Sequence, residues 1–172
     1  LDPSNLPFAT SYRLGNWQFI TENQNPALYQ LTNVLTESYQ YDRDRLVQVT
    51  DETSGISTVY LWSYNGTHPV AEIKNATFAN VMQSLGGDYM VNQLYNSYAP
   101  DMNVVNNLRN VLINSQVTTM TFKLLVGVTS ITDARGIKTS YEYDSFGNLK
   151  NIRDLNNRLL QTIQVHYIGE YL

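Results

Sequence analysis

Hydrophobic and polar residues alternate along several stretches of the chain, as is typical of β-strands. From Ile137 to Tyr143 every second residue faces one side, which predicts a strand with one packed face and one wet face. From Ser57 to Tyr64 one side is aromatic and the other aliphatic, which predicts a strand covered on both sides. We expect strands near residues 10–14, 16–21, 34–41, 46–50, 56–64, 69–74, 117–123, 127–132, 137–143, 148–153 and 159–167.

A short motif recurs between these strands: an aliphatic residue, two residues, an aliphatic residue, one residue and an aspartate. The copies are Leu46-x-x-Val49-x-Asp51, Val128-x-x-Ile131-x-Asp133 and Leu149-x-x-Ile152-x-Asp154. Glycine follows the first two aspartates, at Gly55 and Gly136. Aspartate accepts bonds from the amides just after it, and glycine allows positive φ, so the motif predicts hairpin turns in an antiparallel meander.

Residues 76–116 interrupt the β pattern with helical spacing. Thr77 predicts an N-cap, Gly86-Gly87 predicts the end of the first helix, and Pro100 stops the second. The expected inward residues are Phe78, Val81, Met82 and Leu85, then Met90, Leu94, Tyr95 and Tyr98, and finally Val104, Val105, Leu108, Val111 and Leu112. Such short helices need support, so this insert is either a lid on one end of the sheet or a partner-contacting element.

The predicted fold is therefore mainly β with a small helical insert. An antiparallel meander of hairpins forms a curved sheet, and helices near 77–112 pack on it. We divide the chain into hairpins at 1–75, a helical insert at 76–116 and hairpins at 117–172. The three segments are expected to form one compact unit, a fragment of a larger array whose targeting signal lies outside it.

Composition excludes several classes of function. The 172 residues include 11 basic and 15 acidic side chains and no cysteine. There is no basic stretch, so nucleic acid is not an expected partner. Without cysteine, disulfides and thiolate chemistry are excluded, and no run is long and apolar enough to predict a membrane span.

Candidate catalytic residues and metal ligands are few. The histidines, His68 and His166, have no partner at metal-ligand spacing. Asp42 and Asp44 have the spacing of an acidic pair, but the arginines around them favour a charged hairpin turn instead. We therefore predict no catalytic residue, no metal site and no cofactor.

Aromatic residues give the remaining candidates for a binding site. Tyrosine is abundant, with 13 residues against 5 Phe and 2 Trp. Aromatic rings stack on sugars, so Trp17, Trp62 and Tyr64 are weak candidates for ligand binding. The alternative is that these rings pack between strands as part of the scaffold.

The stretch Tyr141-Glu142-Tyr143-Asp144-Ser145-Phe146-Gly147-Asn148-Leu149 resembles the tyrosine–aspartate (YD) repeat of Rhs-type proteins. The resemblance covers residues 34–78 and 117–167, and the C-terminal part is similar to the ends of YD-repeat proteins of Bacteroides-type bacteria. It is weaker at Tyr41-Asp42, where the glycine is missing. The resemblance implies hairpins in a curved sheet that can close into a shell. It also implies an exported or surface-displayed parent protein.

On these grounds we expect a non-enzymatic structural or interaction module of a secreted or surface YD-repeat protein. A carbohydrate-binding surface module is the alternative. The expected partners are the rest of the parent protein and a cell-surface protein or glycan. Exposed edge strands also predict edge-to-edge pairing between two copies of the chain, through the N-terminal strands or Thr162–Tyr167.

Overall fold

One open antiparallel sheet organises the molecule, in a computed structural model that describes residues 10–14, 18–19, 31–32 and 35–164. The sheet has ten strands and does not close on itself. In spatial order they are β1 (Thr10–Leu14), β4 (Leu35–Asp42), β5 (Arg45–Asp51), β6 (Ile56–Ser63), β7 (His68–Lys74), β8 (Gln116–Lys123), β9 (Gly127–Thr132), β10 (Lys138–Tyr143), β11 (Leu149–Arg153) and β12 (Leu159–Thr162).

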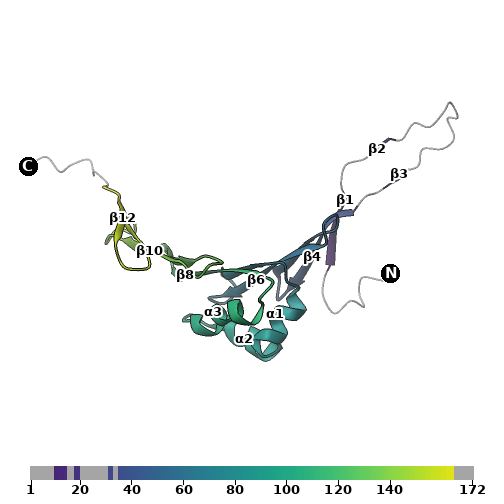
Figure 1. The fold of residues 1–172 in the computed structure, drawn as a ribbon, viewed down its shortest axis with the longest axis horizontal. Helices are drawn as coiled ribbons and strands as arrows, with labels where there is room; N and C mark the ends of the chain where they lie inside the picture. Colours follow the sequence, from purple (N-terminus) through teal and green to yellow (C-terminus); the bar gives the residue numbers. More distant parts are fainter. Residues whose placement is uncertain (1–9, 15–17, 20–30, 33–34, 165–172) are drawn as a thin grey trace, which may run out of the picture.

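Each strand from β4 to β12 lies beside the next one in the chain, so the predicted antiparallel meander is confirmed. Figure 1 shows the sheet as a long twisted ribbon with β1 and β12 at opposite ends. A separate hairpin pairs β2 (Gln18–Phe19) with β3 (Leu31–Thr32). The strand expected at 16–21 is thus seen as Gln18–Phe19, and β3 was not predicted. Residues 165–167 of the last expected strand lie outside the described residues.

Three helices lie between β7 and β8, as the sequence predicts. They are α1 (Phe78–Leu85), α2 (Asp88–Asn96) and α3 (Met102–Val111). The Thr77 hydroxyl caps α1 by accepting from the Asn80 amide, and Asp101, which was not predicted as a cap, accepts from the Asn103 amide at the start of α3. We call residues 78–111 the helical cap. Whether the three sequence segments behave as one compact unit stays a prediction.

The helical cap packs on one face of the sheet, over its middle strands (Figure 1). The buried apolar side chains belong almost entirely to β5–β8 and to the cap: Val47, Val59, Leu61, Tyr64, Val70, Ala71, Ile73, Ala76, Phe78, Val81, Leu85, Val91, Val105, Leu108 and Val117. The inward stripe predicted for α1 is confirmed, with its Met82 partly buried. Three other expected inward residues are exposed, and the prediction was wrong for Tyr98, Val104 and Val111. Tyr98 lies beyond the end of α2, and α3 turns the face of Val105 and Leu108 inward instead.

The other face of the sheet is less covered than the sequence predicts. In β6 the residues Val59, Leu61 and Ser63 are fully buried under the cap, whereas Tyr60 and Trp62 on the opposite face are only half-buried. The expectation that β6 is covered on both sides therefore holds only in part: Trp62 packs against the core, but the aromatic face is less buried than the aliphatic one.

Three turns in the C-terminal part repeat one hydrogen-bond pattern, and each begins at an aspartate: Asp133, Asp144 and Asp154. The carboxylate accepts from the amides two and four residues further on, at 2.8–2.9 Å. The residue three positions on has positive φ between 63° and 84°, and it is Gly136, Gly147 or Asn157. The predicted role of aspartate and glycine in these hairpins is confirmed.

Candidate functional site: the anchors of the helical cap

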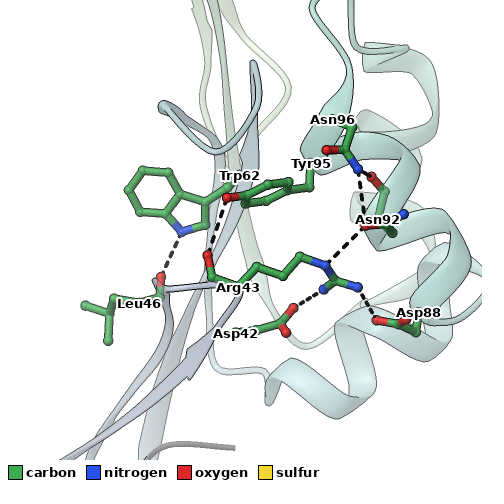
Figure 2. A network of polar contacts seen from close by, with 8 residues as sticks. All are labelled: Asp42, Arg43, Leu46, Trp62, Asp88, Asn92, Tyr95 and Asn96. Carbon is green, nitrogen blue, oxygen red and sulfur yellow. Dashed lines mark hydrogen bonds and ion pairs between the residues drawn. The ribbon is translucent and has the colours of Figure 1, made fainter.

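The richest set of long-range polar contacts joins the helical cap to the sheet. At the β4–β5 hairpin, Arg43 reaches α2: its Nη2 donates to Asp88 Oδ1 at 2.6 Å and its Nε donates to Asn92 Oδ1 at 3.3 Å. The same guanidinium pairs with Asp42, and the Tyr95 hydroxyl donates to the Arg43 carbonyl at 3.4 Å (Figure 2). Since Asp88 is well exposed, this anchor orients α2 more than it stabilises it.

The C-terminal end of α2 docks on the β6–β7 turn. The fully buried Ser63 hydroxyl bonds with the carbonyls of Leu94 at 2.7 Å and Ser97 at 2.9 Å, and the Tyr64 amide donates to Ser97 at 2.8 Å. These bonds fix the end of α2 and its C-cap residue, Ser97, against the sheet.

Gly66 lies in the same turn, against the ring of Tyr95. A Cβ at Gly66 would lie 2.3–2.5 Å from three atoms of that ring, and φ is +70°. Only glycine combines this backbone conformation with such a close approach. Gly66 is therefore required by the docking of α2 as well as by the hairpin.

The first helix is anchored by a side chain from the sheet. The Gln48 Oε1 atom in β5 accepts from the Phe78 amide at 2.6 Å, at the first residue of α1. Its Nε2 atom donates to the Thr50 hydroxyl at 2.9 Å. The Gln48 side chain thus satisfies an orphan donor of α1 and ties this helix to β5.

The third helix is anchored to the C-terminal hairpins through Arg109. Its guanidinium donates to the carbonyls of Thr132 at 2.9 Å and Asp133 at 3.1 Å, to the Thr119 hydroxyl at 3.1 Å and to Asn106 Oδ1 at 2.6 Å. Desolvation by burial lowers the pKa of Arg109, partly offset by the charge of Asp133. The side chain therefore couples the cap to the first aspartate turn of the C-terminal hairpins.

Of the predicted ligand-binding residues, the structure describes Trp62 and Tyr64. Trp17 lies outside the described residues. Tyr64 is 5% exposed, and its ring meets Phe122 edge to face, so it offers no free ring face to a sugar. Trp62 is half-buried, its Nε1 donates to the Leu46 carbonyl at 2.8 Å, and the guanidinium of Arg45 lies 5.9 Å from its ring centroid.

The histidine and acid candidates take structural positions. His68 begins β7 and its ring lies 4.6 Å from that of Phe122, while His166 is outside the described residues. Asp42 ends β4, and Asp44 lies with Arg43 in the tight turn before β5, where both residues have positive φ. Within residues 35–164 and the shorter described segments, no group of three or more His, Asp or Glu side chains could hold a metal ion.

Several carboxyl groups have lowered pKa values, and turn geometry explains most of them. Backbone bonds, the largest from the Ile137 amide, lower the pKa of Asp133, and the Arg158 amide does the same for Asp154. Backbone bonds from Ser54 and Thr53 lower the pKa of Asp51. Hydrogen bonds within the hairpins thus stabilise the ionised form of these carboxylates. A carboxylate stabilised in this way is suited to closing a turn and poorly suited to exchanging protons with a substrate.

A shallow hollow of about 280 Å³ opens between α1, α2 and α3. Its lining is largely apolar and includes Leu85, Met90, Leu94, Pro100 and Val104. No charged pair or histidine lines it, and Asp101, its one acidic residue, caps α3. The hollow has the volume of a small-molecule site but lacks convergent polar groups among its lining residues.

Sequence reasoning missed the anchors of the cap. Ser63 and Gln48 carry no local signal, because their partners are distant in sequence. Arg109 does carry one, since it is the lone basic residue between Lys74 and Lys123. A single cation on an otherwise uncharged helix face was the observation that could have identified it.

These features define a mainly β protein: an open meander of hairpins with a helical cap bound to one face. Residues 126–162 match the family described as RHS Repeat. This matched segment contains the three aspartate turns. This match is consistent with an Rhs or YD-repeat protein and confirms the resemblance for the C-terminal hairpins. An RHS repeat indicates a structural repeat module of a surface or secreted protein. No curated protein matches the chain.

Among the described residues, none of the helices has the length and apolar character needed to cross a membrane.

Proposed function

We propose that this chain is a non-catalytic structural module of a surface or secreted YD-repeat protein. In this proposal the helical cap holds the middle of the sheet rigid and fixes the position of the RHS hairpins beside it. The observation that carries the proposal is Arg109, whose guanidinium bonds with the end of β9 and with the first turn of the RHS repeat.

The polar groups of the described residues support this role, because they form hydrogen bonds that close the hairpins and attach the helices to the sheet. Carboxylates close hairpins, and side chains from β5 and β6 cap α1 and α2. No buried side-chain nitrogen or oxygen atom in the described part of the chain lacks a hydrogen-bond partner. An active site would require some groups to remain available for substrate.

Arg109→Met tests the proposal. Methionine keeps much of the aliphatic stem but removes the donors to Thr132 and Asp133, so the cap should release the RHS hairpins. We expect amide hydrogen exchange in residues 126–162 to accelerate about tenfold or more, while β5–β7 remain protected. Mass-spectrometric exchange measures both regions in one experiment.

Arg135→Met is the matched control. Arg135 lies in the same turn and its side chain is 79% exposed, pairing with Asp133 rather than with the cap. This substitution should leave the exchange of residues 138–162 within about twofold. Equal effects of the two substitutions, or none from Arg109→Met, would contradict the bracing role of the cap.

A second candidate function is carbohydrate binding at Trp62. The supporting observation is that the indole is held in place by its bond to Leu46 and lies on the less buried face of β6. Trp62→Ala should then abolish retention on a glycan array without unfolding the chain. Tyr89→Ala, which removes an exposed ring from α2, is the control and should leave retention unchanged.

A further inference from the structure

The β6–β7 turn contains a chemically reactive pair of residues. Asn65-Gly66 is the only Asn-Gly pair in the sequence of 172 residues. In such a pair the backbone nitrogen of the glycine can attack the side-chain amide of the asparagine, because the glycine has no side chain to hinder the approach. The Asn65 side chain is exposed, whereas Gly66 is buried. The group that would be attacked therefore lies in water, and the attacking nitrogen lies under α2.

Three contacts hold Gly66 in place. Its amide donates to the Tyr95 carbonyl at 3.3 Å, and its carbonyl accepts from Arg45 Nε at 2.5 Å. The Tyr95 ring, which extends from α2 toward the sheet (Figure 2), fills the space beside Gly66. The nitrogen is thus hydrogen-bonded and shielded from water, while the reaction requires it to lose its proton and to move toward the Asn65 side chain.

We propose that Asn65 is a deamidation site that the docking of α2 keeps closed. When α2 leaves the turn, the Gly66 nitrogen loses its proton to hydroxide and attacks Cγ of Asn65. A bond between this nitrogen and Cγ forms, the bond from Cγ to Nδ2 breaks, and the side-chain nitrogen takes a proton from water and leaves as ammonia. Water then opens the cyclic imide at one of its two carbonyls, which gives aspartate or isoaspartate at position 65.

The isoaspartate product prevents α2 from docking again. Its main chain runs through the side-chain CH₂ group, so the turn that the Thr67 amide closes on the Ser63 carbonyl gains a backbone atom just before Gly66. Gly66 then no longer fits against the Tyr95 ring. The aspartate product keeps the ordinary backbone, and aspartate, like asparagine, tolerates the φ of 55° at this position. Isoaspartate formation therefore makes the release of this anchor permanent.

Deamidation of the full chain in mildly alkaline buffer tests the proposal. Peptide mapping by mass spectrometry measures the rate at Asn65 in the folded chain and in the same chain unfolded in urea. We expect the folded chain to react about tenfold or more slowly, because the reaction requires local opening of the turn. Equal rates in the folded and unfolded chains would overturn the proposal.

Tyr95→Ala removes the ring that covers Gly66 and should accelerate the reaction in the folded chain by about tenfold. Tyr89→Ala is the matched control, because it removes an exposed ring from the same helix, and it should leave the rate within about twofold. Circular dichroism checks that both variants fold. Arg45→Met, which removes the bond to the Gly66 carbonyl, is a second variant and should accelerate the reaction about threefold or more. Equal rates in Tyr95→Ala and Tyr89→Ala, or no acceleration by Arg45→Met, would contradict protection by the docked helix.

The consequence for the cap is tested on the modified chain. Ion-exchange chromatography isolates the isoaspartate form, and hydrogen exchange compares it with Asn65→Asp, which has the same charge and an unmodified backbone. The amides of α2 should exchange about tenfold faster or more in the isoaspartate form, and at the original rate in Asn65→Asp. An isoaspartate form in which α2 stays as protected as in Asn65→Asp would show that the modification does not release the helix.

Discussion

The two halves of the sheet are held together in different ways. From β5 to β8 the side chains under the helical cap are fully buried, including Val59, Ile73 and Val117. From β10 to β12 no residue is buried, and the strands depend on aspartate turns and cross-strand pairs such as Glu142 with Arg153. The capped half is therefore stabilised by the removal of apolar surface from water, and the uncapped half by local hydrogen bonds.

The difference explains why the family match falls on the uncapped half. An aspartate turn needs aspartate at one position and glycine or asparagine three residues later, so its sequence is specific. A buried core needs only apolar residues of suitable volume, and many sequences satisfy it. Residues 126–162 thus carry a repeat motif that is recognised, whereas the helical cap carries none.

The largest expected effect comes from truncating the capped core. Leu61 is 1% exposed, and Leu61→Ala should lower the free energy of unfolding by about 2–5 kcal/mol through lost burial and a residual cavity. Leu159→Ala, in the uncapped half, should change it by about 0.5 kcal/mol or less. Denaturant titration followed by circular dichroism measures both, and similar losses would show that the halves are not stabilised differently.

A smaller effect is expected where α2 meets the β6–β7 turn. Gly66→Ala places a methyl group against the Tyr95 ring and should destabilise the chain by about 2–3 kcal/mol. Gly55 has nearly the same φ but no atom within 4 Å of an added Cβ. Gly55→Ala should therefore cost only about 1 kcal/mol. If the two substitutions have equal cost, the docking of α2 on Gly66 makes no contribution beyond backbone strain.

Acid should loosen the uncapped half first. Backbone bonds hold the pKa of Asp133 and Asp154 below the ordinary 3.8, so these bonds stabilise the fold fully above that pH and are lost as pH falls through the lowered values. Hydrogen exchange of residues 133–162 should accelerate as pH drops below about 4, once the intrinsic pH dependence of exchange is subtracted. Asp154→Asn should reduce this acid response, because the amide does not titrate. An acid response centred on β5–β8 would contradict the assignment.

The sequence predicted the hairpins well because their determinants are local. The alternation of residues 137–143 and the aspartate turns located β8–β11 within about two residues, and the start of β12 was also correct, but this strand ends at Thr162 instead of residue 167. The sequence also located the three helices, and it identified the inward face of α1 correctly. It placed Tyr98, Val104 and Val111 on the wrong side, because periodicity alone does not fix how a short helix rotates against a sheet.

The candidate site was less predictable. The anchors of the helical cap bond with partners that lie from 10 to 49 residues away in the sequence, as Arg43, Ser63 and Arg109 do. Contacts between such distant residues produce no short motif that could be found in the sequence. The aromatic candidates were chosen for ring chemistry, and Tyr64 proved to be buried beside Phe122. The role of Trp62 in ligand binding stays a prediction.

Native-state hydrogen exchange of the unmodified chain tests the central claim most directly. The account predicts that amides of β6, β7 and β8 exchange only through global unfolding, while those of β10, β11 and β12 open at a markedly lower free energy. Protection that is uniform across the sheet, or highest in the RHS hairpins, would contradict a sheet stabilised from its capped middle.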